Sequence, residues 1–384
     1  MNGEVRILRI STVPLSLNLL LKGQLGYMVS KGLDVSVACS YGPEIEELKA
    51  REQVSYYPIP LTRKFNVFKD IVALFYLIKL IKKIKPHIVH SHSPKAGIVG
   101  MLAAKICNVR LKIHTVAGLP LMETTGFKYR LLVAVEQIAY KCADWVLPNS
   151  VVQMEFIKNN ISTDDKITMI GRGSSNGINL DYFKKGENYN SERVALRVKY
   201  DISEDDIVLV FVGRLANYKG INELVDCFKI LAKKYAKLKL LLVGPFEDIN
   251  PLSKDTIHEI ETNERILSTG YQSDVRPFFV LADIFVFPSY REGFPQAVMQ
   301  ACAYELPCVV TDINGCNELV FEGINGYLVP PKNVKSLINA CELLITNPDK
   351  RASLGNHGRK YLLENFEQKS LWENVYKFYL TNLN

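Results

Sequence analysis

Short runs of aliphatic and β-branched residues alternate with stretches of helical periodicity along the whole chain. Such runs are typical of parallel strands, which are buried on both faces and contain few polar residues. Their alternation with helices predicts two parallel sheets, each covered by helices. The predicted strands are 5–10, 33–39, 87–92, 110–116, 145–150 and 166–171, followed by 207–213, 239–244, 265–270, 283–289 and 307–312. The predicted helices include 22–31, 67–84, 95–107 and 128–142, followed by 220–236, 274–282, 293–305 and 334–346.

A polar segment, residues 184–206, separates the two series of strands. The length of 384 residues also suits two domains better than a single core. We therefore expect one domain over 1–185, a second over 186–366, and a helix over 367–384 that packs back across a domain surface. Ligands of open parallel sheets bind beyond the carboxyl ends of the strands. The predicted fold class is thus α/β, with two Rossmann-like domains and a cleft between them.

Composition indicates the class of protein and the cellular compartment in which we expect it. Apolar residues make up 48% of the chain and charged residues 23%, as in ordinary globular domains. The first residues carry charges where an export signal would be apolar, so we expect a cytoplasmic protein. The eight cysteines show no CxxC spacing and lie mostly in apolar runs, which predicts buried free thiols and no metal site.

The net charge of +7 is unevenly distributed, and residues 63–85 are strongly basic with apolar residues at helical spacing. One interpretation is an ordinary amphipathic surface helix. The other is a helix that touches anionic lipid headgroups, which would place the protein peripherally on the inner face of the membrane. Nucleic-acid binding is not expected, because no aromatic-basic platform or known module accompanies the charge.

The first motif with chemical content follows the strand predicted at 207–213. Gly213 and Arg214 end that strand, and Lys219 and Gly220 precede a predicted helix. A strand–glycine–loop–helix turn presents backbone N–H groups and a helix N-terminus to an anion. Two cations five residues apart suit a diphosphate better than a carboxylate. A solvated basic turn is the alternative interpretation.

A second motif follows the strand predicted at 283–289. Glu292 lies in the loop after this strand, and Pro295 is suited to the first turn of the next helix. A carboxylate at this point can accept hydrogen bonds from sugar hydroxyls close to a phosphate site. Gln300 comes eight residues after Glu292, about two helical turns on, and can lie on the same face.

Together the two motifs resemble the C-terminal half of the large retaining glycosyltransferase family 4, which has the GT-B fold. The matching positions are Gly213, Arg214, Lys219 and Gly220, then Glu292, Gly293, Phe294 and Pro295. The resemblance extends over nearly the whole chain and implies that Gly244, Gly270 and Tyr271 also lie beside the donor. Tyr271 could equally be a surface turn residue. At position 300 the family usually has a glutamate that holds the nucleotide ribose, whereas this chain has Gln300, which keeps one acceptor and loses the charge.

In the first half, the resemblance implies residues on the acceptor side. His114 would be a strand-end histidine that contacts the transferred sugar, followed by Gly118 in the loop; a core histidine is the alternative. His90 and His92 alternate along a strand, so we expect only one of them to face the cleft. Lys95, at a helix start, would meet an acceptor phosphate or simply be solvated.

The N-terminal loop from Thr12 to Asn18 departs from the commoner Gly-Gly turn of the family. This variant resembles a subfamily that builds bacterial surface polysaccharides, including capsule and lipopolysaccharide, and lipid-linked oligosaccharides. The resemblance implies a UDP-sugar donor, a polyprenyl-diphosphate-linked or polysaccharide-precursor sugar acceptor, and Asn18 on the acceptor side.

The expected reaction is a retaining hexosyl or N-acetylhexosaminyl transfer. Arg214 and Lys219 would stabilise the charge that grows on the leaving phosphate, Glu292 would orient the donor sugar, and His114 would line the reacting face. We expect neither a metal nor another cofactor, because no Asp-x-Asp motif is present and two protein cations can replace the metal.

Alternative functions remain open from the sequence. A nucleotide-sugar epimerase would share the GT-B fold, and Gln300 keeps open a non-catalytic partner subunit. A membrane-binding scaffold would need no donor site at all. A dinucleotide oxidoreductase is excluded, because it needs a GxGxxG turn after the first strand and this chain has none there.

Overall fold

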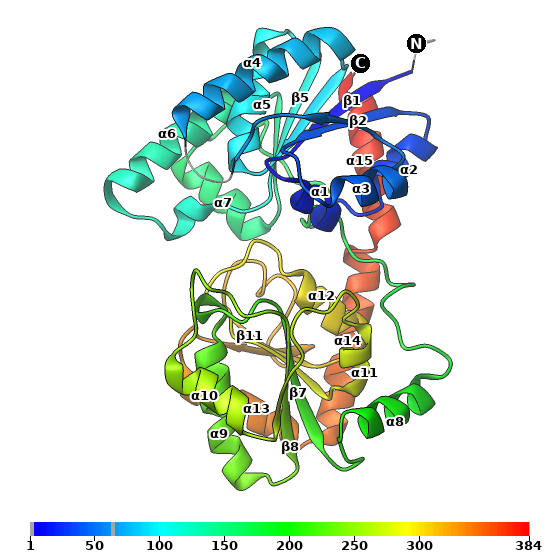
Figure 1. Cartoon of the computed structure of the whole chain (residues 1–384), viewed down its shortest axis with the longest axis vertical. Helices are drawn as coiled ribbons and strands as arrows, with labels where there is room; N and C mark the ends of the chain where they lie inside the picture. Colours follow the sequence, from blue (N-terminus) through cyan, green and yellow to red (C-terminus); the bar gives the residue numbers. More distant parts are fainter. Residues whose placement is uncertain (1–3, 63–65, 384) are drawn as a thin grey trace. The chain divides into compact units, whose positions relative to one another are not determined.

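The computed structural model describes residues 4–62 and 66–383, which divide into two compact units (Figure 1). The first unit comprises Met1–Gly177 together with Gln368–Asn384, and the second comprises Ile178–Glu367. The chain thus changes units at Gly177, whereas the sequence placed the boundary after residue 185. Ile178 belongs to the second unit because its side chain lies in that core and its backbone N–H bonds to the carbonyl of Phe366.

The first unit contains a six-stranded parallel sheet in the order β3-β2-β1-β4-β5-β6. This is the doubly wound order of a Rossmann-like fold, with the switch point between β1 and β4. Its strands are β1 (Arg6–Ile10), β2 (Asp34–Cys39), β3 (Ser55–Pro58), β4 (Ile88–His92), β5 (Leu111–Val116) and β6 (Trp145–Pro148).

The second unit repeats this topology with its own six-stranded parallel sheet, in the order β12-β11-β10-β7-β8-β9. The two parallel sheets expected from the alternating pattern are therefore confirmed. Its strands are β7 (Ile207–Val212), β8 (Leu238–Val243), β9 (Ile266–Ser268), β10 (Ile284–Phe287), β11 (Cys308–Thr311) and β12 (Gly326–Val329).

Helices cover both faces of each sheet (Figure 1). The first unit has α1 (Pro14–Leu20), α2 (Gln24–Ser30), α3 (Ile45–Glu52), α4 (Val67–Ile84), α5 (Pro94–Ile106), the 3₁₀ helix η1 (Pro120–Glu123), α6 (Gly126–Cys142), α7 (Val151–Asn160) and α15 (Gln368–Leu383). The second has α8 (Tyr189–Lys199), η2 (Asn217–Lys219), α9 (Ile221–Lys234), α10 (Lys254–Thr262), α11 (Arg276–Leu281), α12 (Gln296–Ala303), α13 (Val334–Ile345) and α14 (Pro348–Asn365).

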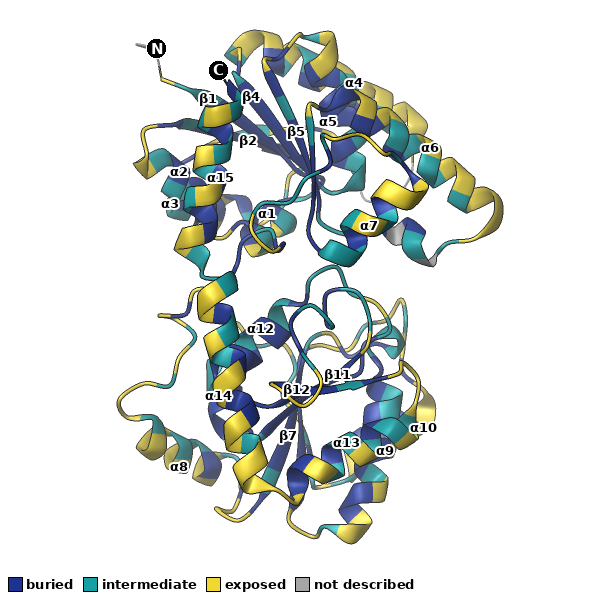
Figure 2. Cartoon of the chain, turned by 180° about the vertical axis from the view of Figure 1, so that it is seen from behind, coloured by how far each residue is buried: buried dark blue, intermediate teal, exposed yellow. Residues whose placement is uncertain are grey.

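Burial follows the apolar patterns of the sequence. Figure 2 shows the strands mostly buried, in dark blue, whereas many helices carry exposed residues, in yellow, on one side. In α9, for example, Leu224, Phe228 and Leu231 recur at helical spacing and are buried against the second sheet. In the first unit, α4, α5 and α6 share one apolar cluster on one face, and α2, α3 and α15 cover the other.

Three details of the predicted strands were wrong. The run 166–171 forms only an isolated bridge, at Ile167, because Gly171 and Gly173 adopt positive φ angles and turn the chain away from the sheet. Conversely, β3 and β12 were missed. Each is an edge strand of four residues paired on one side, and such short strands lack the long apolar run that marks central ones.

Candidate functional site

The turn after β7 is built around close contacts of the backbone. Gly220 adopts φ 71°, and a Cβ atom at this position would lie 2.0 Å from the carbonyl oxygen of Pro288. Only glycine fits, so the start of α9 approaches the loop after β10, where the N–H of Tyr290 donates to the carbonyl of Tyr218 at 2.8 Å. The N-terminus of a fourteen-residue helix therefore points into this turn, as a site for an anion requires.

Gly244 brings a second loop to the same place. A Cβ atom on Gly244 would lie 1.9 Å from the carbonyl oxygen of Gly213, so the ends of β7 and β8 can approach only because Gly244 has no side chain. Beyond them, Leu215 and Phe246 form a bridge. Gly270, after β9, pairs in turn with Gly244. Three strand ends thus meet where the sequence placed the donor.

The two cations of the first motif each contact a carboxylate. The ammonium group of Lys219 lies 2.5 Å from Oε1 of Glu292, and both side chains are largely buried. Ser289 donates a hydrogen bond to the same oxygen at 2.8 Å. Arg214 is more exposed, and its guanidinium lies 2.8 Å from Oε2 of Glu247. The structure therefore brings together Arg214, Lys219 and Glu292, as predicted, and adds Glu247.

The loop that carries Glu292 and Gly293 is held by a partner that the sequence analysis missed. The amide of Asn314 donates to the carbonyl oxygens of both residues, each at 3.0 Å. Gly315 packs so closely that a Cβ atom there would lie 2.5 Å from the oxygen of Gly293. Asn314 and Gly315 follow β11, and nothing in the sequence indicates which loop they support.

The remaining predicted donor residues occupy the same end of the second sheet or its loops. Pro295 is the N-cap residue of α12, and Phe294 packs against Phe366 with ring centroids 5.3 Å apart. Gln300 is half-buried within α12. Tyr271 directly follows Gly270 and is 76% exposed, an exposure that fits a base-stacking residue and a surface turn equally.

His114 is not at the end of its strand. It lies inside β5, fully buried, and its Nδ1 is 2.9 Å from the hydroxyl of Ser91 on β4. Gly97 of α5 packs directly over the ring, because a Cβ atom at Gly97 would lie 2.3 Å from it. Burial lowers the pKa of His114 to about 4, so the ring is neutral at pH 7. The expected position of His114 on the reacting face was therefore wrong, and the alternative of a core histidine holds.

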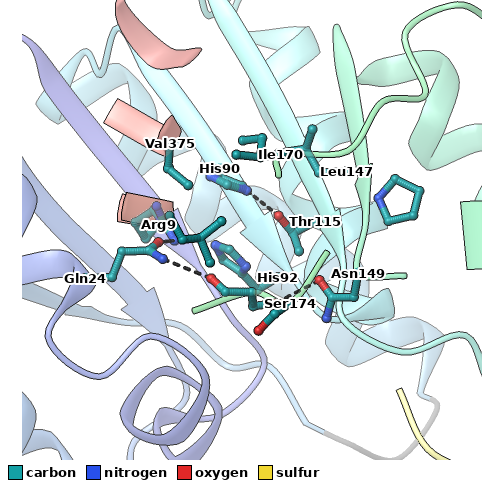
Figure 3. Close-up of a pocket in the computed structure, with 13 residues that line it drawn as sticks. Arg9, Gln24, His90, His92, Thr115, Leu147, Asn149, Ile170, Ser174 and Val375 are labelled. Atoms are coloured by element: carbon teal, nitrogen blue, oxygen red, sulfur yellow. Dashed lines mark hydrogen bonds between the residues drawn. The ribbon is translucent and has the colours of Figure 1, made fainter. Parts of the chain in front are cut away.

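The expectation that only one of His90 and His92 would face a cleft was also wrong. Side chains two positions apart on a strand share a face. Both rings line one small pocket, and their centroids are 4.3 Å apart (Figure 3). The pocket is lined by Arg9, Gln24, His90, His92, Thr115, Leu147, Pro148, Asn149, Ile170, Ser174, Ser175, Leu371 and Val375.

This pocket has a volume of about 30 Å³, enough for one or two water molecules but not for a sugar. Neither ring nitrogen of His92 has a hydrogen-bond partner among the described residues, and such polar atoms are commonly satisfied by buried water. Burial, together with the charge of Arg9, holds the pKa values of His90 and His92 well below the usual range. His92 therefore does not present an open acceptor surface.

A buried polar network around Arg9 was not foreseen. The Arg9 guanidinium donates to the hydroxyl of Tyr379 on α15 and, at 2.7 Å, to the side-chain oxygen of Gln24. The Tyr379 hydroxyl also lies 2.6 Å from Nδ1 of His90. The network anchors α15 on the first sheet, so it holds the C-terminal helix where the sequence predicted only a domain surface. Arg9, which stands between Leu8 and Ile10 in the first strand, was the available signal.

The other residues that were predicted on the acceptor side have different neighbours from those expected. Asn18 is buried in α1 and accepts a hydrogen bond from Arg51 at 2.7 Å, so its amide supports α3. Lys95 lies 3.0 Å from Asp70 of α4, and it is thus neither simply solvated nor open to a phosphate in this state. Gly118 is partly exposed in the loop after β5.

Solved structures place the fold in a known class. The protein of Anabaena described as Alr3699/HepE in complex with UDP superimposes with a TM-score of 0.81 at 16% identity, covering 98% of this chain and 100% of that chain. Two Rossmann-like units of this kind, one with a diphosphate-type turn, define a protein of the GT-B glycosyltransferase fold.

Sequence comparisons show the family. Residues 192–361 match the model described as "Glycosyl transferases group 1", and residues 16–150 match "Glycosyl transferase 4-like". The chain is 33% identical to the capsular polysaccharide biosynthesis glycosyltransferase CapM of Staphylococcus aureus over 98% of this chain and 97% of that one. It is 29% identical to the Escherichia coli UDP-Gal:alpha-D-GlcNAc-diphosphoundecaprenol alpha-1,3-galactosyltransferase over 80% and 79% of the chains. The chain belongs to this glycosyltransferase family, and the protein is a glycosyltransferase.

Proposed function

We propose that the protein transfers a hexosyl or N-acetylhexosaminyl group from a UDP-sugar to a polyprenyl-diphosphate-linked or polysaccharide-precursor sugar acceptor, with retention at the anomeric carbon. The observation that carries the proposal is the convergence of Arg214, Lys219 and Glu292 at the N-terminus of α9. The proposal of UDP is supported by the Anabaena structure, which is described as a complex with UDP. The proposal of a lipid-linked acceptor is supported by the E. coli relative, whose description names one. The S. aureus relative supports a role in capsule or other surface-polysaccharide synthesis.

The chemistry follows from where charge develops. As the anomeric bond breaks, negative charge grows on the β-phosphate of the leaving nucleotide. Lys219, Arg214 and the helix N-terminus stabilise this charge, which is usually the dominant electrostatic contribution. Glu292 accepts hydrogen bonds from the donor sugar while it keeps Lys219 in place. Because these groups supply the positive charge, the proposed reaction needs neither a metal ion nor another cofactor.

A panel of UDP- and GDP-sugars, tested by thermal shift and by donor hydrolysis in the presence of EDTA, checks this proposal. One donor should raise the melting temperature, and the shift should be lost in Lys219→Ala and in Arg214→Ala. Activity that disappears with EDTA and returns with Mg²⁺ would refute metal independence. No response to any donor at millimolar concentration would refute the donor site and favour a non-catalytic partner subunit.

An epimerase is the second candidate, because a GT-B nucleotide-sugar epimerase would use the same diphosphate turn. Product analysis distinguishes the two functions. An epimerase releases an isomer of the intact nucleotide sugar, whereas a transferase releases UDP and forms a new glycosidic bond only when an acceptor sugar is supplied.

We further propose that the protein, located in the cytoplasm, contacts the inner membrane surface through residues 63–85. Residues 63–65 lie outside the described part of the chain, and α4 covers most of the remainder. Phe68 and Phe75 point outward on this helix, with Phe68 84% exposed. The exposed lysines Lys79, Lys82 and Lys83 follow in the next turns. An apolar stripe followed by lysines is suited to an anionic bilayer surface.

Helix α6 adds a similar stripe in the same unit. Phe127 is 83% exposed, and Leu131 and Ile138 follow at helical spacing on the exposed side. Lys128 and Arg130 are exposed beside them. Both α4 and α6 pack against α5, so the two stripes belong to one side of the first sheet (Figure 2). Within the described residues, 4–62 and 66–383, no helix is long and apolar enough to span a bilayer.

Vesicle co-sedimentation tests this contact. The protein should bind vesicles that contain phosphatidylglycerol and should bind pure phosphatidylcholine vesicles more weakly. Phe68→Ser combined with Phe75→Ser should reduce binding, while donor hydrolysis in solution stays unchanged. Equal binding by the double variant and the native protein, or concentration-dependent dimers in place of vesicle binding, would refute the contact.

A further inference from the structure

Both terminal nitrogens of Arg214 are already engaged by groups of the protein. One lies 2.8 Å from Oε2 of Glu247, and the other donates to the hydroxyl of Tyr218. The Tyr218 hydroxyl in turn donates to the same carboxylate oxygen at 3.3 Å. Arg214, Tyr218 and Glu247 therefore form a closed triangle beside the proposed diphosphate site.

The backbone fixes Glu247 in this position. Its N–H donates to the carbonyl of Leu215 at 3.1 Å, and the N–H of Leu215 donates to the carbonyl of Pro245 at 2.8 Å. The Glu247 side chain is only 15% exposed, whereas that of Arg214 is 57% exposed. Because the backbone of Glu247 is held and its side chain is mostly covered, whereas Arg214 is exposed, an exchange of partners requires movement of Arg214 rather than of Glu247.

A diphosphate would compete for the same guanidinium group. An arginine binds phosphate oxygens through paired N–H groups of its planar fork, and the contacts with Glu247 and Tyr218 already engage both terminal nitrogens. Glu247 thus offers Arg214 an internal anion at the point where the donor would offer an external one. The contact between Lys219 and Glu292 differs, since we assign Glu292 itself to the donor sugar.

We propose that Glu247 is an intramolecular competitor of the donor diphosphate, which holds Arg214 when the site is empty and recaptures it as the nucleotide product leaves. The inference rests on the proposed function, because it needs a nucleotide diphosphate at Arg214. Glu247 is a positioning residue that acts through Arg214 and does not touch the reacting atoms. Its effect is to limit how tightly UDP is held after transfer.

If Glu247 competes with the diphosphate, substitution of Glu247 should raise the affinity for UDP. A substitution that merely damaged the fold would lower this affinity. Glu247→Gln should bind UDP about two- to five-fold more tightly in isothermal titration calorimetry, the range expected when an exposed ion pair no longer competes. Glu247→Ala should also tighten UDP binding. Release of UDP, measured by stopped-flow displacement, should slow by a similar factor, and inhibition by UDP should become stronger.

Asp248→Asn is the matched control, since it removes the same charge at the exposed neighbouring position and should leave UDP affinity unchanged. Native protein that binds UDP while Glu247→Gln binds it equally or more weakly would overturn the competition and leave the proposed function intact. An equal gain in Asp248→Asn would also overturn it, because the effect would then be one of net charge. No UDP binding by the native protein or any variant would overturn both proposals.

Discussion

Glu136 offers a sharp test of how burial controls protonation in the first unit. It lies on α6 with its side chain almost fully buried and with Tyr140 as its polar neighbour. Burial raises the pKa of Glu136 from the ordinary 4.5 to about 7, and the Tyr140 hydroxyl opposes this rise only in part. The unfolded chain releases this proton near pH 4.5, whereas the folded chain keeps it until about pH 7. The folded state therefore binds more protons in this window, and stability falls as pH rises through it.

The size of the effect follows from the two pKa values. The difference between 7 and 4.5 corresponds to about 3 kcal/mol, because each pH unit is worth about 1.4 kcal/mol. This penalty is absent below about pH 4.5 and complete above about pH 7. Glu136→Gln removes the ionisable proton, so the variant should be more stable relative to native protein at pH 8 than at pH 5. The expected difference is about 2–3 kcal/mol, because part of the penalty is already present at pH 5.

The two tryptophans provide the assay. Trp145 on β6 and Trp372 on α15 both belong to the first unit, so urea unfolding followed by tryptophan fluorescence reports on that unit alone. His114 lies nearby, and its pKa is lowered to about 4, so it makes stability rise with pH between about 4 and 6.5. This opposite trend is common to native protein and variant and cancels in their difference.

Glu155→Gln is the control, because it removes a carboxylate at an exposed position on α7 of the same unit. The reasoning would be refuted if Glu136→Gln changed stability equally at pH 5 and pH 8. That result would mean that the carboxyl group ionises in the folded protein as it does in the unfolded chain.

Three further predictions concern other parts of the molecule. Lys219→Ala should lower donor turnover by about 10²–10³, as expected for a group aimed at developing charge, and unchanged steady-state turnover would contradict this role. Gly220→Ala should destabilise the second unit by at least about 1–3 kcal/mol in thermal unfolding, because the new Cβ would meet the carbonyl of Pro288 at a positive φ angle; wild-type stability would show that the turn relaxes freely. Tyr379→Phe should cost about 1–3 kcal/mol by tryptophan-monitored urea unfolding, since it leaves buried polar atoms of Arg9 and His90 without a partner; an unchanged midpoint would show that water replaces the hydroxyl.

Most residues of the proposed donor site could be picked out from the sequence because the motifs that carry them are local. Gly213, Arg214, Lys219 and Gly220 are consecutive parts of one turn, and a strand followed by glycine and a helix can be recognised without long-range contacts. The partner of Lys219 was also among the predicted residues. Glu247 and Asn314 were not, because each reaches the site from a different strand end and nothing local to either residue indicates it.

The first unit shows the limit of such reasoning. The acceptor-side residues were assigned because they stand next to predicted strand or helix ends: His114, His92, Lys95 and Asn18. Whether each of these side chains is exposed depends on where the strand or helix really ends and on which residues pack over it. Gly97 covers His114 from α5, and Asp70 pairs with Lys95 from α4, so packing between neighbouring elements decides the surroundings of both side chains.

The sequence by itself determined the two parallel sheets, the glycine turn with its two cations and the family to which the chain belongs, because each of these depends on residues close together along the chain. Only the tertiary structure decided which polar residues are buried, which carboxylate holds Arg214, and that Arg9 and Tyr379 join the first strand to the last helix. The physical reason is that side-chain burial and ion pairing depend on how distant segments pack, and periodicity along the chain does not contain that information.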